Sequence, residues 1–151
     1  MPAPAMHTTT RLLHYAALSA NLGLIGWVIL WQTTLSPHPH LNPWIMAGVW
    51  VIPMLLPLPG LLAGRPYTHA WANFILMFYF LHGFTLLWVD EGERWLAVVE
   101  LLITTLAFIC NILFARHRGR ELGIKLKRLS QVEKEEKARH EATESSPAQR
   151  D

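Results

Sequence analysis

Charged residues are nearly absent from the first two thirds of this 151-residue sequence. No Asp, Glu, Lys or Arg occurs in the 53 residues 12–64, or in the 24 residues 66–89. Soluble domains carry about 25% charged residues, whereas this chain has 16%, most of them in its C-terminal third. These uncharged stretches exclude a soluble globular domain, a disordered protein and a nucleic-acid-binding module.

Cysteine is equally scarce, since Cys110 is the only one. A single thiol excludes an internal disulfide framework and any cysteine-rich zinc or iron–sulfur centre. The sequence also lacks P-loop, Ser-x-x-Lys and nucleophile-elbow patterns. We therefore assign no catalytic, cofactor or metal residue, and we expect no nucleic-acid partner.

Four apolar runs stand where charge is missing, and each is long enough to cross a bilayer. A hydrocarbon core about 30 Å thick needs roughly 20 apolar residues in a helix. The expected spans cover about residues 12–31, 44–62, 70–89 and 95–115. The first run exceeds the roughly 7–15 apolar residues of a signal peptide, so we expect it to stay as a helix. The fold class is all-α: a polytopic membrane protein of four transmembrane helices.

Basic residues lie mainly on one side of these spans. The 36–43 loop has no Lys or Arg, and the 90–94 loop has one, Arg94, beside three acids. The positive-inside rule then puts both termini in the cytoplasm. We expect an aromatic belt on the opposite side, formed by Trp31, Trp44, Trp88 and Trp95. The expected parts are a cytoplasmic N-terminus (1–11), the membrane domain (12–115), an amphipathic and charged cytoplasmic helix (116–144) and a disordered tail (145–151).

Prolines interrupt the second span. Pro53, Pro57 and Pro59 lack the N–H that continues a helix. We expect the regular helix to end near Leu56 after about 13 residues, followed by an irregular descent to Arg65. Such backbone survives in lipid only against protein or beside a wet cavity.

Glu100 is the only acid well inside an expected span, and Asn111 lies on the same helix face. A buried ionisable group needs a partner. In an antiparallel hairpin, the residue numbers of two residues at the same membrane depth add up to a nearly constant sum. This depth matching pairs His82 with Glu100 and Asn73 with Asn111. His82 and Asn73 are nine residues apart, about half a turn, so we do not expect both to face the fourth span. We prefer a His82–Glu100 contact.

These four residues form a candidate polar lock that sets the helix register. A proton relay and a water-exposed Glu100 are the alternatives. The first span has two further faces, one polar (His14, Asn21 and Gln32) and one of small residues (Ser19, Gly23 and Gly26). Both faces could pack within the bundle, or one could bind another helix.

The stretch 56–71, Leu-Pro-Leu-Pro-Gly-Leu-Leu-Ala-Gly-Arg-Pro-Tyr-Thr-His-Ala-Trp, is distinctive. Together with Tyr79-Phe80, His82-Gly83, Arg94-Trp95-Leu96-Ala97 and Glu100, it resembles a bacterial family of predicted inner-membrane proteins, domain of unknown function 2069. The resemblance covers roughly residues 11–120. It implies a four-helix protein of the bacterial inner (cytoplasmic) membrane and supplies no reaction.

Within that stretch, Arg65, Tyr67, Thr68 and His69 fall at the expected cytosolic interface. They form a candidate site for a lipid headgroup or a partner, because arginine makes charge-assisted contacts with phosphate. Simple interfacial anchoring is the alternative reading.

The sequence favours a non-enzymatic protein that acts by helix-mediated assembly, either as a homo-oligomer or with a membrane-protein partner, among membrane lipids. The first alternative is a lipid- or small-solute-handling protein that uses the proline-broken second helix and residues 65–69. An intramembrane enzyme using His82 and Glu100 comes third, because these two groups alone imply no particular reaction.

Overall fold

The computed structural model describes residues 5–37, 39–124 and 129–144, and these are helical with no strand. The elements in chain order are α1 (Thr8–Leu30), the π-helical turn η1 (Trp31–Leu35), α2 (Pro43–Leu55), α3 (Leu58–Leu62), α4 (Pro66–Val89), α5 (Arg94–Glu121) and α6 (Leu129–Glu144). Within these described ranges, three helices are long and apolar enough to cross a membrane: α1 extended by η1, α4 and α5.

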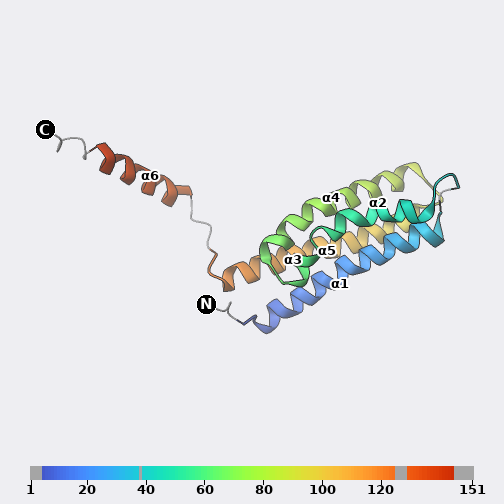
Figure 1. The fold of residues 1–151 in the computed structure, drawn as a ribbon, viewed down its shortest axis with the longest axis horizontal. Helices are drawn as coiled ribbons and strands as arrows, with labels where there is room; N and C mark the ends of the chain where they lie inside the picture. The colour runs from blue at the N-terminus through green and yellow to red at the C-terminus, as the bar shows by residue number, and fades with distance from the viewer. Residues whose placement is uncertain (1–4, 38, 125–128, 145–151) are drawn as a thin grey trace.

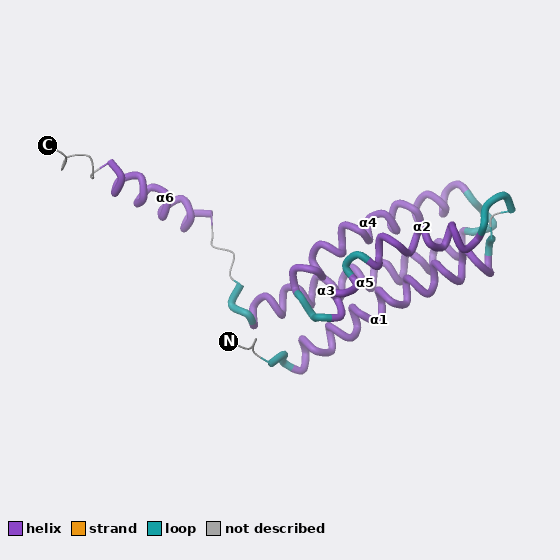
Figure 2. The backbone as a smooth tube through the Cα atoms, viewed as in Figure 1, coloured by secondary structure: helices purple, strands orange, loops and turns teal. Residues whose placement is uncertain are grey.

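The helices α1, α2, α4 and α5 run side by side as a bundle (Figures 1 and 2). α5 packs along both α1 and α4, whereas α2 makes a smaller contact with α1. The start of α1 and the end of α5 lie together. There the backbone N–H of His7 and the hydroxyl of Thr10 both donate to Oε1 of Glu121.

α2 ends where its prolines predict. It covers 13 residues and stops at Leu55, and the chain resumes as α3 at Leu58. Pro57 and Pro59 cannot donate the backbone hydrogen bonds that would extend α2. The expected helix end near Leu56 is therefore confirmed, although Pro53 stays inside the helix.

A glycine turn then leads into α4. Gly64 has a φ of +63°, a conformation that favours glycine. This turn lets the N–H of Arg65 reach the carbonyl of Gly60 at 3.0 Å, which closes the end of α3. Pro66 then occupies the first position of α4, where a missing N–H costs nothing.

The long helices extend beyond the spans expected from hydropathy. α4 begins at Pro66 instead of near residue 70, and α5 continues to Glu121 instead of stopping at 115. A single helix over 116–144 is therefore wrong, because 116–121 belong to α5. Gly123, with a φ of +67°, ends α5, and α6 is a separate helix. The expected tail at 145–151 lies outside the described residues.

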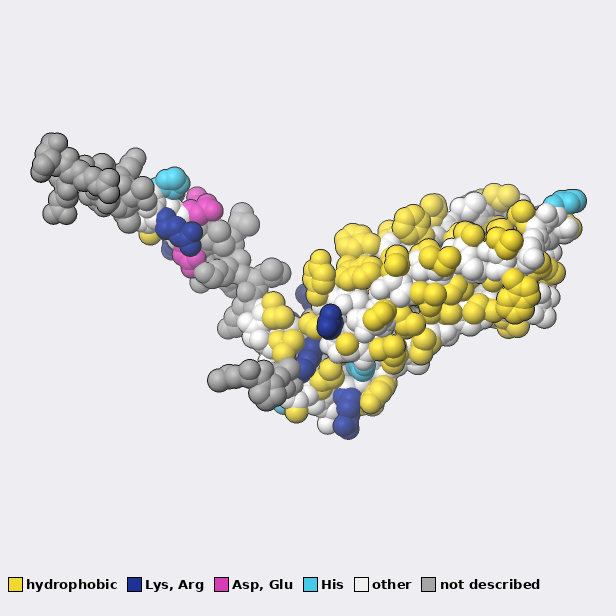
Figure 3. Space-filling view, in the orientation of Figure 1, with side chains coloured by type: hydrophobic (Ala, Val, Ile, Leu, Met, Phe, Trp, Pro, Cys, Tyr) yellow, Lys and Arg dark blue, Asp and Glu magenta, His cyan; other side chains and the backbone are white. Residues whose placement is uncertain are grey.

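The core lies where α1, α2, α4 and α5 meet. Leu24, Val28, Met54, Leu76 and Tyr79 are among its buried members. Hydrophobic side chains also cover the visible outer face of the bundle, and the basic side chains visible on this face gather at the end where the chain begins (Figure 3). An apolar outer surface of this extent suits contact with lipid.

Candidate functional site

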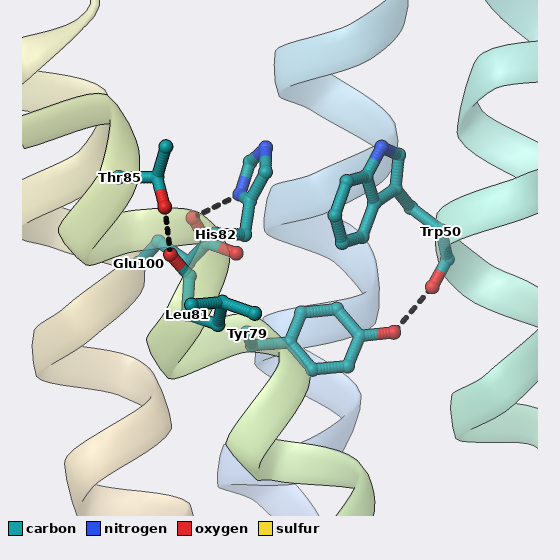
Figure 4. A network of polar contacts seen from close by, with 6 residues as sticks. All are labelled: Trp50, Tyr79, Leu81, His82, Thr85 and Glu100. Carbon is teal, nitrogen blue, oxygen red and sulfur yellow. Dashed lines mark hydrogen bonds and ion pairs between the residues drawn. The ribbon is translucent and has the colours of Figure 1, made fainter. Parts of the chain in front are cut away.

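One polar contact inside the bundle joins Glu100 of α5 to His82 of α4. Glu100 is fully buried, and its Oε2 lies 2.8 Å from Nδ1 of His82. Figure 4 shows the two side chains facing each other. One proton lies between these atoms, carried either by the imidazole or by the carboxyl group, and it forms a hydrogen bond in both cases. The structure thus brings together the pair that depth matching selected.

Gly83 explains how His82 and Asn73 both reach α5. A Cβ on Gly83 would lie 2.8 Å from Cγ of Leu101 and 3.5 Å from Oε2 of Glu100, so its missing side chain lets the helices approach closely. Gly83 lies about 100° from His82 and about 80° from Asn73 around α4. His82 and Asn73 therefore lie on opposite sides of Gly83, which faces α5. The expectation that only one of them reaches α5 is wrong.

Asn111 joins three helices. Its Nδ2 donates to Oδ1 of Asn73 on α4 at 3.0 Å, and its Oδ1 accepts from Nδ2 of Asn21 on α1 at 3.2 Å. Asn73 also donates to the carbonyl of Phe108 at 3.3 Å. We name Asn21, Asn73 and Asn111 the asparagine chain. Sequence reasoning missed the link to Asn21, because the expected spans 12–31 and 95–115 place Asn21 at the depth of residues 105–106.

Aromatic rings enclose the imidazole of His82. The ring centroid of Trp50 lies 4.1 Å from it and that of Trp31 lies 5.3 Å away. Tyr79 donates its hydroxyl proton to the backbone carbonyl of Trp50, which ties α4 to α2 (Figure 4). Trp31 is buried, so its expected place in an interfacial belt is wrong. It begins the π-helical turn η1, which hydropathy does not predict.

Several buried polar atoms around this contact have no hydrogen-bonding partner within the described residues. They include Oε1 of Glu100, Nε1 of Trp31 and Oγ1 of Thr104, one turn after Glu100. Each such atom costs about 1–3 kcal/mol. We name Glu100, His82, Trp31, Trp50 and Thr104 the Glu100 cluster. Its His82–Glu100 hydrogen bond can hold a proton. No group of three or more metal-ligating side chains occurs among the described residues.

The structure separates the four residues of the expected headgroup site: Arg65, Tyr67, Thr68 and His69. Arg65 and Tyr67 are exposed, whereas Thr68 and His69 are buried. His69 packs against Phe114 with the rings tilted and their centroids 4.2 Å apart, and its Nδ1 lies 3.0 Å from the carbonyl oxygen of Arg65. Consecutive residues of α4 point about 100° apart, so these four do not form one surface site.

A further polar contact closes the end of the bundle where the chain begins. Arg118 is buried, and its guanidinium lies 2.9 Å from Oε2 of Glu121. Glu121 also accepts hydrogen bonds from Thr10 and His7 at the start of α1. Sequence reasoning placed Arg118 in a surface-exposed basic tail, because it ended the last span at 115.

The two faces of α1 have opposite surroundings. The polar face is buried: His14, Asn21 and Gln32. The small-residue face is exposed: Ser19, Gly23 and Gly26. A Cβ on Gly23 or Gly26 would meet no atom within 4 Å. Of the two faces that the sequence leaves open, only the small-residue face is free to meet another helix.

Long apolar helices, an apolar outer surface and polar groups paired inside define an α-helical membrane protein. The chain belongs to the family described as Predicted membrane protein (DUF2069), whose profile matches residues 16–119. This range contains the Glu100 cluster and the asparagine chain, and it confirms the resemblance found in the sequence. No curated protein matches the chain, and neither does any solved structure.

Proposed function

We propose that this chain is a non-enzymatic, four-pass protein of the bacterial inner membrane, with both termini in the cytoplasm, that works by helix-mediated assembly through α1. The observation that carries the assembly role is a row of small residues exposed on the outer face of α1. The crossing number and orientation have separate support.

Two features support four crossings. The start of α1 and the end of α5 meet through Thr10 and Glu121, so the chain crosses an even number of times between them. α2 and α3 together extend over residues 43–62. A helical path of about 20 residues is about 30 Å long, which matches the hydrocarbon core.

Charge at the two ends of the bundle supports the orientation. The end where the chain begins carries exposed Arg11, Arg116 and Arg120. At the other end, the carboxylate of Glu93 accepts a hydrogen bond from the hydroxyl of Ser36. Lysine and arginine are retained preferentially on the cytoplasmic side.

A topology reporter tests this orientation. A periplasm-active reporter fused after Asp151 is expected to be inactive, and the same reporter inserted at His40 is expected to be active, because the two sites lie on opposite sides of the membrane. The measurement is reporter activity per amount of fusion protein. The reverse pattern would contradict cytoplasmic termini.

The exposed row on α1 follows a heptad spacing. Its members, which we name the α1 seam, are Leu12, Ala16, Ser19, Gly23, Gly26 and Leu30. Alternating intervals of four and three residues give the 3.5-residue repeat along which two helices pack over many turns. Small residues let backbones approach, and close packing stabilises helix pairs in lipid.

Filling the α1 seam tests the proposal. The Gly23→Leu, Gly26→Leu double variant is expected to stop self-association without unfolding the monomer, because both positions open onto free space. Energy transfer between labelled chains in lipid vesicles measures the association. Gly48→Leu is the matched control, since a Cβ on this α2 glycine also meets no atom within 4 Å.

The energy-transfer result distinguishes self-association through the α1 seam from binding to a different partner and from no assembly. Loss of energy transfer in the seam variant but not in the Gly48 variant supports the proposal. A heteromeric partner would appear as a crosslink from a photoreactive residue placed at Ser19. A chain that stays monomeric and forms no such crosslink would overturn the assembly role.

A further inference from the structure

A groove of about 490 Å³ lies between the first turns of α4 and the last turns of α5. Three of its lining residues are small, Ala70, Ala115 and Gly119, and three are longer and polar, Tyr67, Arg116 and Arg120. The groove exists because the small residues leave the helix surfaces apart. It adjoins the end of the bundle at which the chain begins.

Two arginines of this groove have no carboxylate partner among the described residues. Arg116 and Arg120 are exposed and one helical turn apart, so their side chains are neighbours. Arg118 between them points into the bundle and pairs with Glu121. Among the described residues, no carboxylate lies within ion-pair distance of Arg116 or Arg120. The groove therefore offers two guanidinium groups to an anion.

An apolar groove continues from this charged one. It has a volume of about 260 Å³, and Ala70 lines both grooves. Phe74, Met77 and Phe108 line the continuation, deeper along α4 and α5. We name the first groove, which carries the two arginines, the mouth, and the second groove the apolar channel. Together they match a molecule with an anionic head and a hydrocarbon tail. A free phosphate ion would use only the mouth.

We propose that the two grooves together bind one anionic phospholipid. Arg116 and Arg120 hold its phosphate by charge-assisted hydrogen bonds, which the planar guanidinium forms in pairs. One acyl chain follows the apolar channel past Phe74 and Met77. This site contains no residue of the α1 seam, so the lipid-binding proposal can fail without the assembly proposal failing, and the reverse.

Lipid binding to the full-length protein tests the proposal. The protein in detergent is titrated with dioleoylphosphatidylglycerol, and bound lipid is measured by native mass spectrometry. Arg116→Gln with Arg120→Gln is expected to weaken binding by about tenfold or more. Arg11→Gln with Arg65→Gln is the matched control, because it removes the same charge from two exposed arginines outside the groove. That control is expected to retain binding.

A third variant tests the groove and not the charge. Gly119→Leu keeps both arginines and fills the mouth, and it is tolerated because a Cβ there meets no atom within 4 Å. It is also expected to weaken binding by about tenfold. An equal loss of lipid binding in the Arg11 and Arg65 control would show a general attraction of the lipid to a basic surface. That result would overturn the proposed binding site. Unchanged binding in Gly119→Leu would also overturn it.

Two added ligands distinguish a lipid site from an anion site. Dioleoylphosphatidylcholine, which is zwitterionic, is expected to bind about tenfold more weakly than the anionic lipid. Inorganic phosphate is expected not to displace the bound lipid, because it makes no contact with the apolar channel. Displacement by inorganic phosphate at equal concentration would overturn the lipid assignment.

Discussion

Replacing His82 with leucine is expected to lower the free energy of unfolding by about 2–4 kcal/mol, because a buried hydrogen bond is lost (about 0.5–1.5 kcal/mol) and Oε2 of Glu100 is left unpaired (about 1–3 kcal/mol). The cost is high because Glu100 is fully buried and, among the described residues, His82 alone forms a hydrogen bond with its Oε2. The other carboxylate oxygen, Oε1, already lacks a partner within the described residues. Reversible unfolding in detergent, followed by circular dichroism, measures the change.

A double variant supplies the decisive comparison. Replacing His82 and Glu100 together by leucine is expected to recover much of the loss, since neither residue then leaves the other as an unpaired polar group. His40→Leu is the control, because His40 is exposed in a loop and its replacement should change stability by less than about 0.5 kcal/mol. Additive effects of the two single replacements would contradict direct coupling.

Replacing Asn111 with leucine is expected to lower the free energy of unfolding by about 2–6 kcal/mol. It removes two interhelical hydrogen bonds, each worth roughly 0.6–1.7 kcal/mol in a membrane, and leaves Oδ1 of Asn73 unpaired at about 1–3 kcal/mol. The same unfolding assay measures the loss. Thr105→Val is the control on the same helix, because its exposed hydroxyl bonds only to its own helix at Leu101.

The asparagine chain also predicts which of its members contributes most to the free energy of unfolding. Replacing Asn21 alone is expected to lower the free energy of unfolding less, because Asn21 makes one interhelical hydrogen bond, to Asn111, whereas Asn111 makes two. Asn111 has bonds to both neighbouring helices, so its loss loosens α1 and α4 from α5 together. Equal losses for Asn21 and Asn111 would contradict this central position.

We interpret the Glu100 cluster and the asparagine chain as two locks at different depths of the bundle. Polar contacts at two depths oppose sliding of one helix along another, because any shift would unpair buried groups in a medium without water. A fixed register would hold the α1 seam and the α4–α5 groove in constant positions, which both proposed interactions require.

The sequence by itself determined the features that depend on position along a helix. The uncharged stretches predict membrane helices, Pro57 and Pro59 predict the end of α2, and residue numbers predict that His82 and Glu100 share a depth. Each follows because helix length increases linearly with residue number, at about 1.5 Å per residue. The family could also be recognised from its distinctive residues.

Only the tertiary structure decided the features that depend on rotation about a helix axis. Gly83 sets how closely α4 approaches α5, and so lets Asn73 and His82 both make contacts. The turn η1 brings Trp31 inward, and the start of α4 separates Tyr67 from His69. Each residue adds about 100° of rotation, so the side chain that faces a neighbour is known only once the helices have packed.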